Sequence, residues 1–115
     1  MPAYNKLSPP PALYNGEQAL LVNNAATDSG VTKTQQIALV QSIDTPNLMI
    51  INTTNQPAPI QVAVTDLDAS YGALTVGGSA LSVAAGVSQA VAVPFPLVRA
   101  QFAVAPTSGS LTIAL

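Results

Sequence analysis

Apolar and polar side chains alternate most clearly near the end of the chain. From Val98 to Val104, apolar residues occupy every second position, and the only arginine, Arg99, lies between them. Because residues two apart on a strand share a face, this pattern predicts a strand with one buried side. Residues 106–110 contain proline and glycine, which favour a turn, and the alternation resumes over residues 111–115. The pattern predicts a hairpin whose last side chain belongs to the core. The side chains predicted to be buried are Val98, Ala100, Phe102, Val104, Leu111, Ile113 and Leu115.

A second hairpin is predicted in the middle of the chain. Residues 48–54 are mostly apolar and β-branched, and residues 55–59 contain two prolines. Residues 60–65 then alternate, with Ile60, Val62 and Val64 on one face. The prolines favour a turn between two strands.

Further short apolar runs are separated by glycine or proline clusters. They are residues 19–22, 35–43, 71–76, 81–83 and 87–93. Several short strands at a spacing of about 8–12 residues are typical of an antiparallel sandwich or barrel. We therefore predict an all-β fold, an antiparallel β-sandwich of about eight strands, either jelly-roll or immunoglobulin-like. No segment has the apolar spacing and caps of a long helix.

Residues 1–16 differ from the rest of the chain. The triple proline at 9–11 can form neither a helix nor a strand ladder, so this segment is predicted to be an extended, proline-rich arm. Residues 17–115 are predicted to form a single β-sandwich domain. The alternatives for the arm are a frayed terminus or packing on its own domain. The apolar anchors along the arm are Tyr4, Leu7, Leu13 and Tyr14.

Charge is scarce in this sequence and limits the choice of partners. Charged residues make up 7% of the chain, against a typical value of about 25%, and the net charge is -2. With only three cations the chain cannot neutralise a run of phosphates, so nucleic acid and anionic membranes are not expected partners. The first residues lack a secretory signal, and no apolar run is long enough to span a membrane. We expect synthesis in a cytoplasm without export.

The residue types that most enzymes and metal sites use are missing. The chain has no histidine and no cysteine, which excludes the usual catalytic triads and ordinary zinc sites. Asp66 and Asp68 are spaced like the first ligands of a calcium loop. However, Tyr71 takes the place of the required glycine and Gly77 that of the bidentate glutamate. We expect no enzyme activity, no metal and no cofactor.

Two further features have competing interpretations. Asn52, Thr53 and Thr54 match the acceptor pattern for N-glycosylation, which without an export signal is interpreted as a chance match. Arg99 is either an anchor at an interface or a solvated strand residue.

The shortage of charge bears on the exposed edges of the predicted sheets. Soluble monomers usually protect strand edges with lysines or other charged residues, and this chain has three cations in all. We therefore expect its edges and faces to be covered by other subunits.

The strand and turn pattern resembles that of a known class of proteins. Residues 48–54, 60–65, 81–86, 97–102 and 109–115 resemble the small β-sandwich structural proteins of tailed bacteriophages, and most of all their capsid decoration, or cement, proteins. The resemblance implies a protein without an active site that lies on the outer capsid surface of the virion. It also implies a homo-oligomer, usually a trimer, that bridges neighbouring subunits of the major capsid protein.

Two alternatives remain at this point. One is a component of a phage tail or fibre, and the other is an immunoglobulin-like module that binds a carbohydrate or another ligand. The second alternative lacks the usual aromatic platform, because tryptophan is absent and the three tyrosines are scattered. Under the preferred interpretation, the residues expected to contact the partner are Tyr4, Leu7, Pro9, Pro10, Pro11, Leu13, Tyr14 and Arg99.

Overall fold

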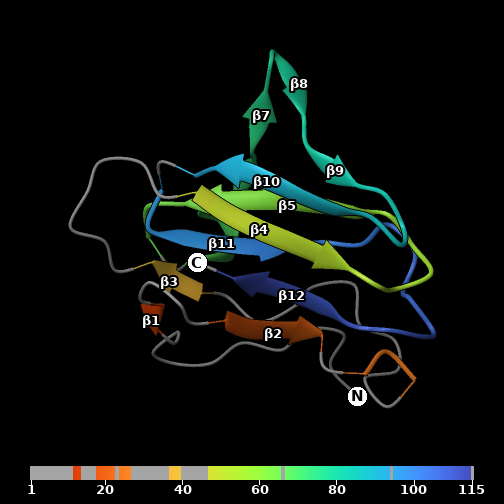
Figure 1. The fold of residues 1–115 in the computed structure, drawn as a ribbon. Helices are drawn as coiled ribbons and strands as arrows, with labels where there is room; N and C mark the ends of the chain where they lie inside the picture. The colour runs from red at the N-terminus through yellow and green to blue at the C-terminus, as the bar shows by residue number, and fades with distance from the viewer. Residues whose placement is uncertain are drawn as a thin grey trace.

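The structure, a computed structural model, is nearly all β. It describes residues 12–13, 18–22, 24–26, 37–39, 47–65, 67–93 and 95–114. These residues form twelve strands and one 3-10 helix, η1, with no α-helix among them (Figure 1). Five of the twelve strands are only two residues long, which explains the difference from the predicted number of about eight. The elements are β1 (Ala12–Leu13), β2 (Gln18–Val22), β3 (Ile37–Leu39), β4 (Asn47–Asn52), β5 (Ala58–Ala63), η1 (Asp68–Ser70), β6 (Gly72–Ala73), β7 (Thr75–Val76), β8 (Ser79–Ala80), β9 (Ser82–Val83), β10 (Ser88–Ala92), β11 (Leu97–Ala100) and β12 (Leu111–Ala114).

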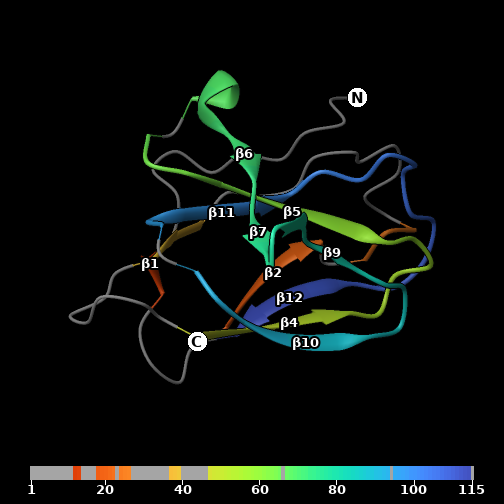
Figure 2. The ribbon, with the colours of Figure 1, turned by 90° about the horizontal axis from the view of Figure 1, so that it is seen from above.

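The strands form two larger sheets and one hairpin. A four-stranded sheet has the order β10-β4-β12-β2, and a second sheet has the order β1-β3-β11-β5-β6 with β9 also paired to β5. All of these pairs are antiparallel except β1 with β3. Figure 2 shows β5 and β11 on one side of the molecule and β4, β10 and β12 on the other. The hairpin joins β7 to β8 through Gly77 and Gly78, whose positive φ angles suit the predicted tight turn.

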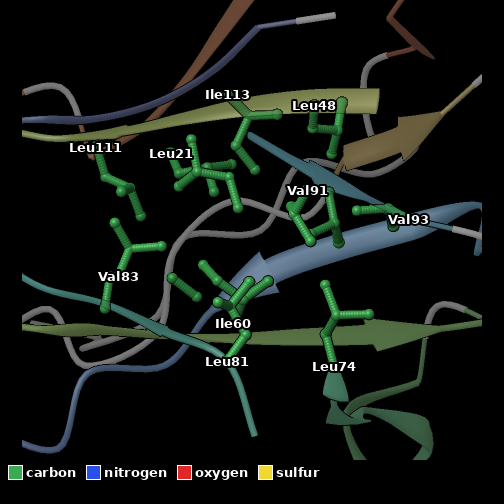
Figure 3. Packing of buried hydrophobic residues seen from close by; sticks show 14 of the residues in the cluster. Leu21, Leu48, Ile60, Leu74, Leu81, Val83, Val91, Val93, Leu111 and Ile113 are labelled. Atoms are coloured by element: carbon green, nitrogen blue, oxygen red, sulfur yellow. The ribbon is translucent and has the colours of Figure 1, made fainter. Parts of the chain in front are cut away.

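One hydrophobic core lies between the two sheets. Leu48 and Ile50 of β4 point into the same cluster as Ile60 of β5 and Val98 of β11. Figure 3 shows this cluster between the strands of the two layers. Phe102 belongs to it, which confirms the predicted burial of that ring. Each fully buried Leu, Ile, Val or Phe side chain contributes about 1.5–3 kcal/mol to folding.

Both predicted hairpins are wrong. β4 and β5 lie in different sheets, and so do β11 and β12. Each pair is therefore joined by an arch that crosses from one sheet to the other. Alternation indicates only which side chains face the core, and here both sheets face the same core, so a hairpin and an arch give the same pattern.

The strands of the two sheets pair in a nested order. β2 pairs with β12, β3 with β11, β4 with β10, and β5 with both β6 and β9. Two further ladders, β12 with β4 and β11 with β5, join these pairs into sheets. Strands near the start of the chain therefore lie beside strands near its end, and successive long strands alternate between the two layers.

The last part of the chain departs from its predicted alternation at one position. Leu111 and Ile113 are buried as predicted, but Val104 is 59% exposed. The strand ends at Ala100, so the period of two no longer applies at Val104. Leu115 lies outside the described residues.

Candidate interaction surface

The outer face of the four-stranded sheet carries no charged side chain. Leu48 and Ile50 point from β4 into the core, so the residues that alternate with them point outward. The register places Met49 beside Ala90 of β10 and Ala114 of β12. We call these outward residues the neutral face. In the rows set by the register they are Ser88, Ile51, Thr112 and Leu20, then Ala90, Met49, Ala114 and Gln18, then Ala92 and Asn47.

The composition of the neutral face is unusual for a sheet in water. Its apolar members are alanine, leucine, isoleucine and methionine, and Met49 is 41% and Leu20 42% exposed. The outer face of a solvated antiparallel sheet is normally polar. By contrast, the centre of a protein interface is depleted of charge and enriched in methionine. The neutral face shares the lack of charge and a methionine with such a centre, whereas its three alanines and its serine are of types that interfaces contain less often.

The hairpin β7–β8 is a second uncharged surface. Residues 75–80 are all exposed, and the hairpin projects away from the two sheets (Figure 1). At its base the Leu81 N–H donates to the Leu74 carbonyl at 2.7 Å, and the Leu74 N–H donates to the Ile60 carbonyl at 3.0 Å. The side chains of Leu74 and Leu81 are buried in the core. An isolated hairpin is marginally stable, so these anchors are what hold its tip in one place.

Arg99 is buried and contacts residues of its own domain. Its side chain is 2% exposed, so the interpretation as a solvated strand residue is wrong. The Nε–H donates to Oε1 of Gln61 at 2.8 Å, and the guanidinium lies 3.9 Å from the centre of the Tyr71 ring. This cation–π contact and hydrogen bond join β11, β5 and the segment after η1. The expected contact of Arg99 with a partner stays a prediction. Arg99 is on β11 of the second sheet and so is not part of the neutral face.

Asn52 is a buried polar residue that joins three parts of the chain. It is 1% exposed, and its Nδ2 donates to the carbonyls of Gln56 at 2.9 Å, Val83 at 2.9 Å and Ala84 at 3.3 Å. Its Oδ1 accepts from the N–H of Thr54 at 3.0 Å and from the Thr54 hydroxyl at 2.6 Å. Because the amide nitrogen is buried and bonded, the folded domain does not present Asn52 for glycosylation.

The residues after Asn52 fasten the β4–β5 arch to the second arch, between β11 and β12. The Thr53 hydroxyl donates to the Ser110 carbonyl at 3.0 Å and accepts from the Ser110 N–H at 2.9 Å. Asn55 accepts from the N–H of Thr107 at 3.0 Å and donates to its hydroxyl at 2.8 Å. Gly109 has a φ of 81°, and a Cβ there would overlap the Thr53 carbonyl. The two arches therefore need glycine at this position.

Most of the residues predicted to contact a partner lie outside the described residues. They are Tyr4, Leu7, Pro9, Pro10, Pro11 and Tyr14. Leu13 is in β1, opposite Leu39 of β3, so the end of the predicted arm pairs with the second sheet. Asp66 also lies outside the described residues. The neutral face was not predicted as a site, although the apolar run 48–51 was a signal for it because both faces of that strand are apolar.

Neither the described residues nor known proteins indicate a chemical activity. Within the described part of the chain, no three Asp, Glu, His or Cys residues lie close enough to hold a metal ion, and no helix is long and apolar enough to cross a membrane. Comparison of the chain with family models, curated proteins and solved structures finds no match. The neutral face is therefore the feature from which a function can be argued.

Proposed function

We propose that this protein is a non-enzymatic structural subunit of a bacteriophage virion. In this proposal it decorates the outer surface of the capsid, where it bridges neighbouring subunits of the major capsid protein and stabilises the shell. The observation that carries the proposal is the neutral face, whose ten positions include no charged residue. A subunit held permanently on a particle can leave such a face for its neighbours to cover, whereas soluble monomers rarely expose large apolar patches.

The proposed fold is a jelly roll, one of the two sandwich types expected from the sequence. Its support is the nested pairing, with β2 beside β12, β3 beside β11 and β4 beside β10. That order arises when a long antiparallel hairpin with four strands in each arm is folded over itself. Successive strands of each arm then enter opposite sheets. An immunoglobulin-like domain instead keeps several consecutive strands paired in one sheet. Jelly rolls are common in viral capsid proteins, and this fold-level association supports the proposal.

Bridging requires more than one contact surface on the same body. The neutral face and the β7–β8 hairpin are separate uncharged surfaces, and each is held by residues that reach the core. We assign one contact to each surface. The arm supplies a third contact through its tyrosines and leucines, because a triple proline restricts the free chain and so lowers the entropy lost on docking. A trimer is the oligomer that the resemblance implies.

Locating the protein in the particle tests the proposal. Virions of the phage that encodes the chain are purified on a density gradient, analysed by quantitative mass spectrometry and imaged by electron cryomicroscopy. We expect many copies per particle, at sites on the outer shell between major capsid subunits. Absence from purified virions would overturn the proposal, and density confined to the tail would replace it with the tail or fibre alternative.

A substitution on the neutral face tests the surface that carries the proposal. Met49→Lys places a charge at the centre of this face without touching the core, and Val104→Lys places the same charge at an exposed apolar position elsewhere. Both variants should fold, as judged by thermal melting. On particles stripped of the native protein, Met49→Lys should lower occupancy about tenfold or more, because a buried unpaired charge costs several kcal/mol, while Val104→Lys should bind normally. Equal occupancy of both variants would exclude the neutral face as the capsid contact.

A further inference from the structure

The outer edge of β10 has backbone hydrogen-bonding groups that no described strand pairs with. The Asn52 N–H donates to the Val87 carbonyl at 3.1 Å, which fixes the phase of the β4–β10 ladder. In an antiparallel pair the hydrogen-bonded residues alternate, so Gln89 and Val91 bond to β4. The N–H and C=O groups of the intervening residues point away from β4, and within the described part of the chain β10 pairs with no other strand. These residues are Ser88, Ala90 and Ala92.

Among the described residues, β10 has no lysine, other charge, proline or bulge that would prevent pairing with another chain. Natural proteins protect edges with lysine, other charges, proline or a bulge. β10 has the sequence Ser-Gln-Ala-Val-Ala and keeps an unbroken register with β4 over all five residues. The opposite edge of the same sheet, β2, has a register shift between Leu111 and Thr112 of its neighbour β12. β10 is therefore the regular and unprotected edge of this sheet.

We propose that β10 pairs with β10 of a second copy of this chain about a twofold axis at Ala90. In that antiparallel arrangement Ala90 faces Ala90 of the second copy, and Ser88 faces its Ala92. All of these residues have outward backbone groups, so each opposed pair exchanges two N–H···O bonds. The two four-stranded sheets become one continuous sheet.

The side chains at this edge favour a second copy as the occupant. Those beside the axis on the neutral face are alanine and serine, which are small enough to lie opposite their own copies without a clash. On the inner side Gln89 lies opposite Val91 of the second copy. No charged residue is placed opposite its copy, so the edge is self-complementary. The pairing also joins the two neutral faces into one larger surface that the capsid contact can use.

A twofold pairing of edges closes at two copies, so it is a different contact from the trimer that the resemblance implies. It depends on the β10 edge alone and not on the location of the protein in a virion. Failure of this inference would therefore leave the proposed function standing, and the reverse also holds.

Substitutions at Ala90 test the pairing with the full chain in sedimentation velocity and light scattering over a range of concentrations. Wild type should form a dimer. Ala90→Pro removes an outward N–H while leaving the β4 ladder intact, and it should raise the dimer Kd about tenfold or more. Ala90→Lys and Ala90→Glu should each weaken the dimer about tenfold, because like charges then face each other across the axis. An equimolar mixture of these two variants should restore dimers containing one copy of each.

The control is Met49→Lys, which adds the same charge to the neighbouring strand of the same face and should leave the dimer intact. Hydrogen exchange gives a second measurement: the amides of Ser88, Ala90 and Ala92 should be protected at high concentration and exchange rapidly on dilution. A monomeric wild type at all concentrations would overturn the inference. So would a dimer that survives Ala90→Pro. A dimer lost in Met49→Lys but kept in Ala90→Lys would overturn it as well, since that result would place the contact on the sheet face.

Discussion

Replacing Asn52 by Asp tests how far the fold depends on one buried amide. The substitution preserves shape but replaces a donor group that bonds to the carbonyls of Gln56, Val83 and Ala84 with a carboxylate oxygen. Three carbonyl oxygens then face a negative charge at a site that is 1% exposed. A buried acceptor left without its donor costs about 1–3 kcal/mol, and an unpaired buried charge costs about 3–5 kcal/mol. We expect the free energy of unfolding to fall by about 3–5 kcal/mol at pH 7.

The loss should depend on pH with a definite sign. Burial beside carbonyl oxygens disfavours the carboxylate, so it raises the pKa of the introduced Asp in the folded state above its unfolded value of about 3.9. The folded protein then binds more protons than the unfolded chain between those two pKa values. The variant should therefore regain stability as the pH falls from neutrality through the raised pKa towards about 4, measured relative to wild type at each pH.

Urea denaturation at several pH values, followed by circular dichroism, measures both effects. Asn55→Asp is the matched control, because it makes the same chemical change at an exposed residue of the same arch. The hydroxyl of its partner Thr107 can turn to donate to the new carboxylate, so the control should lose less than about 1 kcal/mol and show little change with pH. If Asn52→Asp matched this control in size and pH dependence, the proposed role of the buried amide would be refuted.

Four further outcomes follow from the structure. Phe102→Ala leaves a cavity in the core and should lower the unfolding free energy by about 3–5 kcal/mol in denaturant titrations; a neutral result would contradict the burial of the ring. Gly109→Ala places a Cβ against the Thr53 carbonyl and should lower the free energy of unfolding by more than about 2 kcal/mol, so an unchanged melting temperature would count against the arch contact. Arg99→Met keeps length but loses the hydrogen bond and ring contact, with an expected cost of about 1–3 kcal/mol by the same titration; a stabilised variant would show that burying this charge has a net cost. Deleting residues 2–11, which spares β1, should leave thermal melting unchanged and reduce occupancy on stripped particles; full occupancy would exclude the arm as a contact.

The positions of the long strands could be predicted from periodicity because each strand has one face in the core. The run predicted over residues 48–54 contains most of β4, and Leu111 and Ile113 alternate as expected in β12. The pairing of these strands could not be predicted in the same way. A hairpin and an arch place the same residues inside, and the five-residue connection at 53–57 is within the range of hairpin loops, so its length does not distinguish them. The connections at 53–57 and 101–110 are longer than the two-residue Gly77–Gly78 turn, which does form a hairpin.

Asn52 and Arg99, two of the three buried polar residues among those described, differ in how far the sequence indicates their burial. Asn52 continues the inward series of Leu48 and Ile50, so its phase indicated burial, and a buried amide requires hydrogen-bond partners. Those partners come partly from residues 83 and 84, about thirty positions away, which no local pattern reveals. Arg99 is harder, because it occupies an outward phase that periodicity assigns to solvent. Its burial depends on Gln61 and Tyr71 from two other segments.

The departure from simple alternation in β4 connects the fold with the proposed function. In a strand that contacts water on one side, outward positions are usually polar, yet the outward residues here include Met49 and Ile51. Folding of one chain explains the inward residues, because it buries them between the sheets, but it leaves Met49 41% exposed and Ile51 only partly buried. Because only 7% of the chain is charged, the exposed apolar side chains of this face, and not its lack of charge, distinguish it from a solvated sheet face. In the proposed function, covering subunits account both for these apolar outward groups and for the edge of β10 that no described strand pairs with.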